Sequence, residues 1–178
     1  MIPAKVQKAM NEQIAKEYFS GWLYMQMAAW FEKENLKGFA HWLRIQAQEE
    51  ACHGLIFFNH ICGRGGDVAL GQISAPGAKF HSALDIFEKG LAHEYLVTAS
   101  INGIMEAAIA TKDFASQSML KWFVDEQVEE EANFDEMRSK LARLKKDDGN
   151  GLMVLDKELS VRVFVMPAPL AAGAPAAP

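Results

Sequence analysis

Apolar residues recur every three or four positions along four long stretches of the chain, which is the spacing of one face of an α-helix. Pro3 suits the first turn of the first helix, and the "SALD" segment that begins at Ser82 resembles the capping box of the third. The helices are predicted over residues 3–34, 39–62, 83–111 and 114–146. The pattern therefore predicts an all-α protein built on four long helices.

Short turns join the first helix to the second and the third to the fourth, so each pair is expected to form an antiparallel hairpin. Residues 67–82 form the only long irregular segment inside the domain. At about 3.3 Å per residue this segment could reach roughly 50 Å, which is the length of the bundle. A four-helix bundle with a long crossover loop follows, and this loop allows the second and third helices to run parallel.

The end of the chain has a different composition. Residues 151–166, "GLMVLDKELSVRVFVM", predict a short fifth helix whose Val-rich end is equally compatible with a strand. Residues 167–178, "PAPLAAGAPAAP", are rich in Pro and Ala and predict a disordered tail. The folded domain is thus expected to span residues 1–166.

The two hairpins resemble each other at an offset of 77 residues. The aligned polar residues are Glu17 with Glu94, Glu50 with Gln127, and His53 with Glu130. Each of them interrupts the apolar stripe of its helix. Glu17 and His53 lie about 25 to 28 Å from the turn of the first hairpin, and Glu94 and Glu130 lie equally far from the turn of the second. All six side chains are therefore expected to meet near the middle of the bundle.

Four of these residues are carboxylates, and no Lys or Arg occupies the same stripes near that level. They are Glu17, Glu50, Glu94 and Glu130. Unpaired buried charges cost several kcal/mol each, so the acids must be protonated or neutralised. Two divalent ions would balance four negative charges, with His53 as a nitrogen ligand and Gln127 as a weaker contact. Such a ligand set favours iron or manganese and matches the di-iron carboxylate pattern of helical bundles.

The two halves of this set differ, because only the first carries Glu-x-x-His. We therefore expect two unequal metal positions. The firmer one would use Glu17, Glu50 and His53, and the looser one Glu50, Glu94 and Glu130. Tyr24 lies two turns after Glu17 on the same stripe, so it is a candidate electron donor to bound oxygen. The alternative for Tyr24 is a core aromatic residue whose hydroxyl is hydrogen-bonded.

Five segments resemble bacterial non-haem ferritin, from near the start of the chain to about Ser160: "NEQIAKEYFSGWLYMQMAAW", "LRIQAQEEACH", "HEYLVTASIN", "WFVDEQVEEE" and "GLMVLDKELS". The resemblance implies a ferritin-like bundle that oxidises Fe(II) with O2 or H2O2 and stores it as ferric mineral. The implied ferroxidase centre comprises Glu17, Glu50, His53, Glu94 and Glu130, with Gln127 nearby. A third iron position is implied at Glu49, Glu126, Glu129 and Glu130, the last three of which share one helix face.

The resemblance also implies a hollow shell of 24 identical subunits, with the fifth helix near the fourfold axis. The segment beyond Ser160 departs from the family pattern. Independently of the family, the first helix is apolar on nearly every side between Tyr18 and Phe31, which predicts at least a dimer. No haem is expected, because Ala51 follows Glu50 where a haem-ligating methionine would stand.

Composition narrows the class of protein further. A formal charge of −5 and a pI near 5.5 argue against a nucleic-acid partner or a basic membrane surface. No apolar run is long enough to span a bilayer, and the N-terminus lacks a signal-peptide core, which predicts a cytoplasmic protein. Cys52 and Cys62 would lie about 15 Å apart on one helix, too far for a disulfide.

Three other functions remain open from the sequence. A haem-containing bacterioferritin would normally repeat Glu-x-x-His in the fourth helix, where this chain has "QVEE". A di-metal peroxidase or oxygenase would need an electron partner or a substrate pocket. A purely structural bundle would keep its buried acids protonated and bind no metal.

Overall fold

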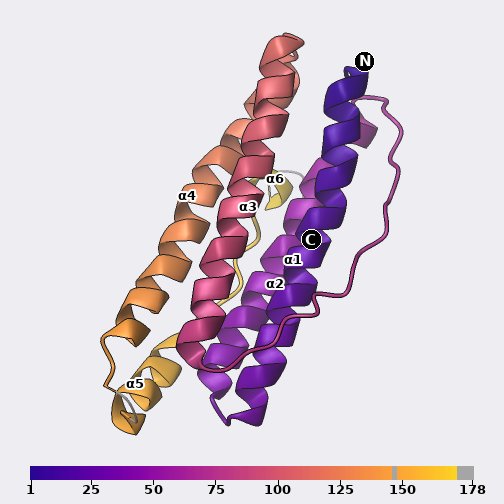
Figure 1. Ribbon diagram of the computed structural model, residues 1–178. Coiled ribbons are helices and arrows are strands. Elements are labelled where there is room, and N and C mark those ends of the chain that lie inside the picture. Colours follow the sequence, from indigo (N-terminus) through magenta and orange to yellow (C-terminus); the bar gives the residue numbers. More distant parts are fainter. Residues whose placement is uncertain (146–147, 172–178) are drawn as a thin grey trace, which may run out of the picture.

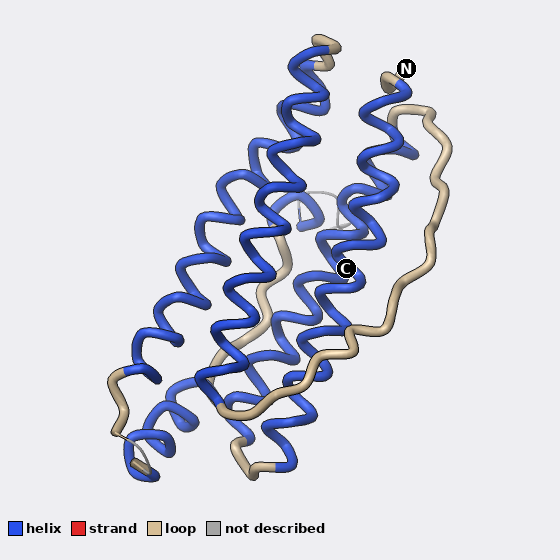
Figure 2. The backbone as a smooth tube through the Cα atoms, viewed as in Figure 1, coloured by secondary structure: helices blue, strands red, loops and turns tan. Residues whose placement is uncertain are grey.

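Every regular element in residues 1–145 and 148–171, the part of the chain that the computed structural model describes, is an α-helix (Figures 1 and 2). The helices are α1 (Ala4–Lys33), α2 (Lys37–Gly63), α3 (Ala83–Ala110), α4 (Phe114–Ala142), α5 (Gly149–Leu159) and α6 (Ala168–Ala171). The first four are long and form the bundle, which confirms the predicted fold class.

The topology is that of two antiparallel hairpins joined by a crossover. α1 pairs with α2, and α3 pairs with α4. The intervening segment, residues 64–82, runs along the length of the bundle before α3 begins (Figure 2). As a result α2 and α3 point in the same direction, the arrangement that the length of the loop allowed.

The two hairpin turns repeat each other as the 77-residue offset predicts. Asn35 and Lys112 hold equivalent positions and both have left-handed backbone conformations, with φ of 59° and 54°. In each turn the next N–H donates to the carbonyl five residues back, at 3.0 Å in the first turn and 2.8 Å in the second. This is the Schellman end of a helix.

Helix ends agree with the sequence patterns except at two places. Ser82 accepts a hydrogen bond from the Asp85 N–H and caps α3 as predicted. α2 begins at Lys37, slightly before the predicted start, whereas α4 ends at Ala142, before the predicted end at Lys146. The earlier end allows Leu144 to pack against the core beside α5. Residues 146 and 147 lie outside the described residues.

The core consists of two apolar clusters stacked along the bundle. One contains Tyr24, Phe31, Phe39, Phe87 and Phe134 among others, and the second contains Met10, Ile14, Phe57, Ile101 and Phe123 among others. Along every long helix the buried acidic residues fall between these clusters. The fold therefore places one polar layer inside an otherwise apolar core.

The fifth helix docks on the start of α2. The side chain of Asp156 accepts hydrogen bonds from the N–H groups of Gly38 and Phe39, at 2.7 and 3.0 Å. A Cβ at Gly38 would lie 1.6 Å from the backbone oxygen of Asp156, so only glycine permits this approach. Leu155 and Leu159 are buried in the core, which fixes α5 to the bundle.

Beyond α5 the chain turns back along the bundle. Residues 160–167, which we name the C-terminal strap, include an extended run, and α6 follows them (Figure 1). The Val-rich end is thus neither helical nor paired in a strand within the described residues. The predicted tail includes α6, and residues 172–178 of that prediction lie outside the described residues.

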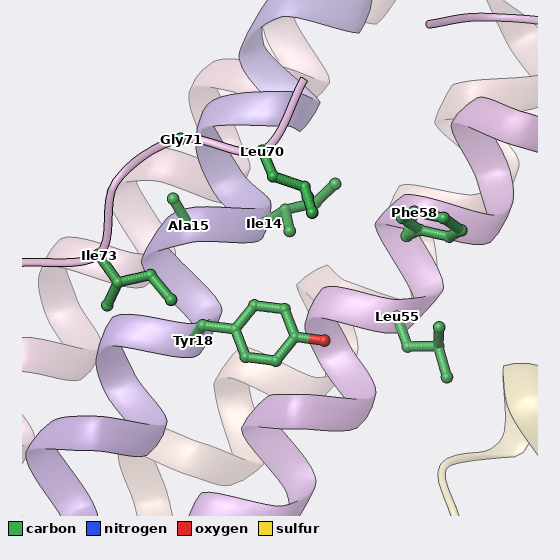
Figure 3. A pocket seen from close by; sticks show the side chains of 8 residues that line it. All are labelled: Ile14, Ala15, Tyr18, Leu55, Phe58, Leu70, Gly71 and Ile73. Atoms are coloured by element: carbon green, nitrogen blue, oxygen red, sulfur yellow. The ribbon is translucent and has the colours of Figure 1, made fainter. Parts of the chain in front are cut away.

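An apolar cavity of about 400 Å³ lies between α1, α2 and the crossover segment (Figure 3). Its lining includes Ile14, Tyr18, Leu55 and Leu70. Tyr18, Trp22 and Met25, spaced along the adjoining face of α1, are 38%, 58% and 43% exposed. The described helices include none that could cross a membrane.

Candidate metal centre

The six polar residues singled out by the internal repeat all lie in the layer between the two apolar clusters. Glu17 comes from α1, Glu50 and His53 from α2, Glu94 from α3, and Gln127 and Glu130 from α4. None is more than 4% exposed. The periodicity of the sequence therefore located a buried polar layer to which all four long helices contribute.

Glu17, Glu50 and His53 form a compact group of potential ligands. One ligand atom from each lies within 4.8 Å of the others, and His53 Nδ1 is 3.5 Å from Glu50 Oε2. Glu17 Oε2, Glu50 Oε2 and His53 Nε2 are buried without hydrogen-bond partners among the described residues. Buried polar atoms normally have hydrogen-bond partners. These three ligand atoms therefore fit a cation, which would take the place of the missing partners.

The second compact group differs from the predicted looser site. It contains His53, Glu126 and Glu130, and His53 Nε2 lies 3.8 Å from Glu126 Oε1. Glu94 belongs to neither group. Its two oxygens accept hydrogen bonds from the Tyr24 hydroxyl and, at 3.2 Å, from Gln127 Nε2.

Two buried glutamines hold the carboxylates in place, and sequence reasoning did not assign them to the site. Gln13 Nε2 donates to Glu17 Oε1 at 3.0 Å, and Gln46 Nε2 donates to Glu130 Oε2 at 2.6 Å. Each glutamine lies four residues before a carboxylate of its own helix, Glu17 or Glu50. A search for amides one turn before the acids would have found both.

Burial dominates the electrostatics of this layer. It raises the pKa of Glu17 and of Glu130 well above the usual value, with further increases from neighbouring carboxylates. The pKa of Glu94 rises to about 7 because burial outweighs the hydrogen bond from Gln127. Burial alone would lower the pKa of His53, but the carboxylates of Glu126 and Glu50 raise it well above its ordinary value.

Protons thus balance part of the negative charge when no cation is bound. In the described chain, Lys and Arg form no ion pair with Glu17, Glu94 or Glu130. Metal ions binding here would displace those protons, because carboxylate and imidazole ligands must be deprotonated.

The acids expected at a third position are arranged differently. Glu49, Glu126 and Glu129 line a cavity of about 280 Å³ together with Trp122 and part of the C-terminal strap. Glu49 Oε2 accepts a hydrogen bond from Arg162 of the strap at 2.6 Å. Only Glu126 and Glu130 of the predicted set join a compact ligand group.

Tyr24 is completely buried at the edge of the layer. Its ring packs against Phe134, and its hydroxyl donates to Glu94, which links the tyrosine directly to the acids. His93, for which the sequence offered no partner, shares a 2.8 Å hydrogen bond with Ser20. His93 therefore has a structural partner outside the two ligand groups.

Buried carboxylates and a histidine supplied by four helices of one bundle resemble the ligand sets of di-metal carboxylate proteins. A family model described as "Ferritin-like domain" matches residues 7–144. The chain therefore belongs to the ferritin family.

Individual relatives agree with this membership. The chain is 41% identical to a bacterial non-heme ferritin of Staphylococcus aureus strain MRSA252 over 164 residues, covering 92% of this chain and 98% of the relative. It is 42% identical to a Staphylococcus epidermidis bacterial non-heme ferritin, also over 164 residues, with the same shares of the two chains covered.

Solved structures show the same relationship. An engineered closed form of the Archaeoglobus fulgidus ferritin superposes with a TM-score of 0.89 at 42% identity, covering 93% of this chain and all of that one. The open-pore ferritin of the same archaeon gives a TM-score of 0.88 at 42% identity, with 91% and 98% covered.

Proposed function

We propose that this protein takes up Fe(II), oxidises it at a di-iron centre in the bundle and stores the ferric product inside a hollow oligomeric shell. Iron is the substrate and the cargo of this reaction. Oxygen or peroxide accepts the electrons, so the activity is that of a ferroxidase.

The observation that carries this proposal is a set of buried ligand atoms that have no hydrogen-bond partner among the described residues, Glu17 Oε2, Glu50 Oε2 and His53 Nε2. A purely structural layer would pair these atoms with each other or with amides, as it does for Glu94 and Glu130. Leaving a buried donor or acceptor unsatisfied costs about 1–3 kcal/mol. Iron binding by these atoms would explain why the fold tolerates that cost.

Each group has a distinct role in the proposed reaction. Glu17, Glu50 and His53 hold one Fe(II), while Glu130 and Glu126 lie beside His53 to receive a second. Glu94 joins them by exchanging its hydrogen bond from Gln127 for a metal. Additional carboxylate charge favours Fe(III) over Fe(II), which promotes loss of an electron. Tyr24, bonded to Glu94, is the residue placed to supply an electron to the bound oxidant.

The assembled form follows from the family and from the surface of α1. We infer a homo-oligomer of 24 subunits built from dimers, with no haem required for oxidation. The apolar residues Tyr18, Trp22 and Met25 supply a face that a second subunit would cover. The cytoplasm is the compartment that this proposal assumes, since both cysteines, Cys52 and Cys62, are free.

A Glu50→Ala variant tests the proposal. Glu50 belongs to the first ligand group and is proposed to bridge the two metal ions, so the variant should still assemble but lose rapid Fe(II) oxidation by about 100-fold or more, corresponding to roughly 3 kcal/mol. Oxidation is followed by the ultraviolet absorbance of the ferric product, and assembly by sedimentation.

Glu106→Ala is the matched control, because Glu106 is an exposed acid of α3 outside the layer. It should oxidise Fe(II) at the parental rate. Parental oxidation by the Glu50→Ala variant would refute the assigned centre, and absence of any iron uptake by the parent would refute the function.

A further inference from the structure

The C-terminal strap places one cation directly on the acidic surface beside the metal centre. Arg162 donates to Glu49 Oε2 at 2.6 Å, and its guanidinium lies 4.6 Å from the centre of the Trp42 ring. The backbone oxygen of Arg162 shares a 2.8 Å hydrogen bond with His41. Side chain and backbone are both held, so the position of this charge is fixed by the fold.

The strap is secured at both ends. Before it, Leu159 of α5 is buried in one apolar cluster, and Asp156 caps α2. At its other end, the last residue of the strap, Pro167, is buried, and Leu170 of the following α6 packs against the second cluster. The segment between these anchors must therefore pass the level of the metal centre, which separates the two clusters.

The surface under the strap is connected to the candidate centre. The cavity of about 280 Å³ lies between Val165 and Met166 of the strap and the acids Glu126 and Glu129 of α4. Glu126 is also the carboxylate 3.8 Å from His53 Nε2, so one residue faces both the cavity and the centre. A cation leaving or joining the centre by this route would meet Glu49 and Glu126.

A guanidinium remains charged at every accessible pH, and its hydrogen bond to a carboxylate is of the strong, charge-assisted kind. Glu49 and Arg162 are both mostly covered, with side chains 14% and 21% exposed, so solvent weakens their attraction only partly. A metal ion that uses Glu49 Oε2 must first displace this tethered charge. The strap thus competes with metal for one carboxylate.

We propose that Arg162 is a specificity-determining residue that limits each subunit to two tightly bound metal ions by occupying Glu49 in place of a third. This inference rests on the proposed function and adds a property of this chain's own C-terminal segment. While the strap is docked, the acids Glu49, Glu126 and Glu129 do not form a third site. Release of Arg162 opens that site.

Binding of Zn²⁺ to the assembled full-length protein tests the inference, because Zn²⁺ is not oxidised and reports occupancy alone. The ions bound per chain and their affinities are measured by calorimetric titration and by metal analysis after dialysis. The parent should bind two ions tightly. Arg162→Met, which keeps an apolar stem over Trp42, should bind a third ion about tenfold to a hundredfold more tightly than the parent does.

Two further variants test whether the third ion binds because Glu49 has lost its contact with Arg162. Adding Glu49→Gln to Arg162→Met should remove the third ion, because the carboxylate freed by the first change is lost. Arg44→Met is the matched control, since Arg44 of α2 likewise pairs with an acid, Glu32, but away from the cavity. It should bind two ions like the parent. If Arg162→Met does not assemble, Arg162→Gln takes its place with the same expectation.

The outcomes separate the two proposals. No tight Zn²⁺ binding by the parent contradicts the di-metal centre itself. Equal stoichiometry and affinity in the parent and both Arg162 variants, whether two ions or three, overturns the role of Arg162 while leaving the centre intact. A third ion that survives in the double variant also overturns it, because Glu49 would then not be its ligand.

Discussion

At the scale of single residues, the metal centre is a set of buried acids whose charge must be balanced in every state of the protein. In the absence of metal, burial raises the pKa of Glu94 from 4.5 to about 7, and the pKa values of Glu17 and Glu130 also rise. Protons therefore bind the folded protein more tightly than the unfolded chain. Stability and pH are linked through these residues.

The sign of this linkage predicts the pH dependence of the metal-free protein. Raised carboxyl pKa values favour the folded state at low pH, and this contribution is lost as pH rises through the folded pKa. For Glu94 that window is from 4.5 to about 7. Burial lowers the pKa values of His60 and His93 from 6.5, and these two groups act in the opposite direction within this window. Relative to a Glu94→Gln variant, the melting temperature of the metal-free protein should therefore fall between pH 4.5 and pH 7.

Asp113 makes stability change with pH in the opposite direction, but at pH values below the window from 4.5 to about 7. Burial raises its pKa, whereas hydrogen bonds from Ser116 and Arg64 outweigh burial and leave the pKa below the usual 3.8. The stability it supplies is lost only as pH falls through that lower value. Melting temperatures of the metal-free parent and the Glu94→Gln variant that run parallel from pH 4.5 to pH 7 would contradict the assigned burial of Glu94.

Sequence periodicity predicted which residues form the polar layer but not how they pair. Glu17, Glu50 and His53 could be placed together because a helix fixes side-chain direction over several turns. The pairing of Glu94 with Tyr24 and Gln127, rather than with the compact ligand groups, depends on side-chain rotamers. Helical spacing alone does not determine those rotamers.

At the scale of helices, the internal repeat extends to backbone conformation. Asn35 and Lys112 end their helices with positive φ at equivalent positions. In both residues the Cβ crowds the following carbonyl, but the short polar side chain of asparagine can compensate by local hydrogen bonding, which the lysine side chain does not do. The turn of the second hairpin is therefore slightly strained at Lys112, whereas the turn of the first hairpin is not.

Lys112→Gly should remove this cost. The variant is expected to raise the free energy of unfolding by about 1 kcal/mol, since glycine has no Cβ penalty at positive φ. Asn35→Gly is the matched control and should change stability little. Thermal denaturation of both variants under one buffer condition measures the difference, and a destabilised Lys112→Gly protein would argue against the left-handed turn.

The C-terminal strap is the element that the sequence predicted least well. Its residues alternate between Val and other types, a pattern shared by strands and by extended segments that lie against a surface. What holds it is a contact between Arg162 and Glu49, which are 113 positions apart. Local patterns carry no information about such a partner, whereas the four long helices were predictable because their signals are local.

At the scale of the whole molecule, the subunit exposes an apolar face formed by α1, α2 and the crossover segment. Trp22 is 58% exposed, and Leu70, which lines the cavity of Figure 3, is 69% exposed. Large exposed apolar patches mark surfaces that other chains cover. This face is therefore expected to lie between subunits.

Trp22→Glu should prevent that association. A carboxylate at the centre of a buried interface costs several kcal/mol, so the variant is expected to sediment as smaller species than the parent. Trp22→Phe keeps an aromatic ring and should assemble normally. A Trp22→Glu protein that sediments like the parent would show that this face stays in contact with solvent.

The proposed function requires paired cations in the polar layer that neutralise the buried acids. Crystals of the assembled protein can be soaked in Fe(II) without oxygen and measured on both sides of the iron absorption edge. Two anomalous peaks per subunit are expected, enclosed by Glu17, Glu50, His53, Glu94 and Glu130. Iron found only on the outer surface, with this layer holding no anomalous density, would contradict the proposed function.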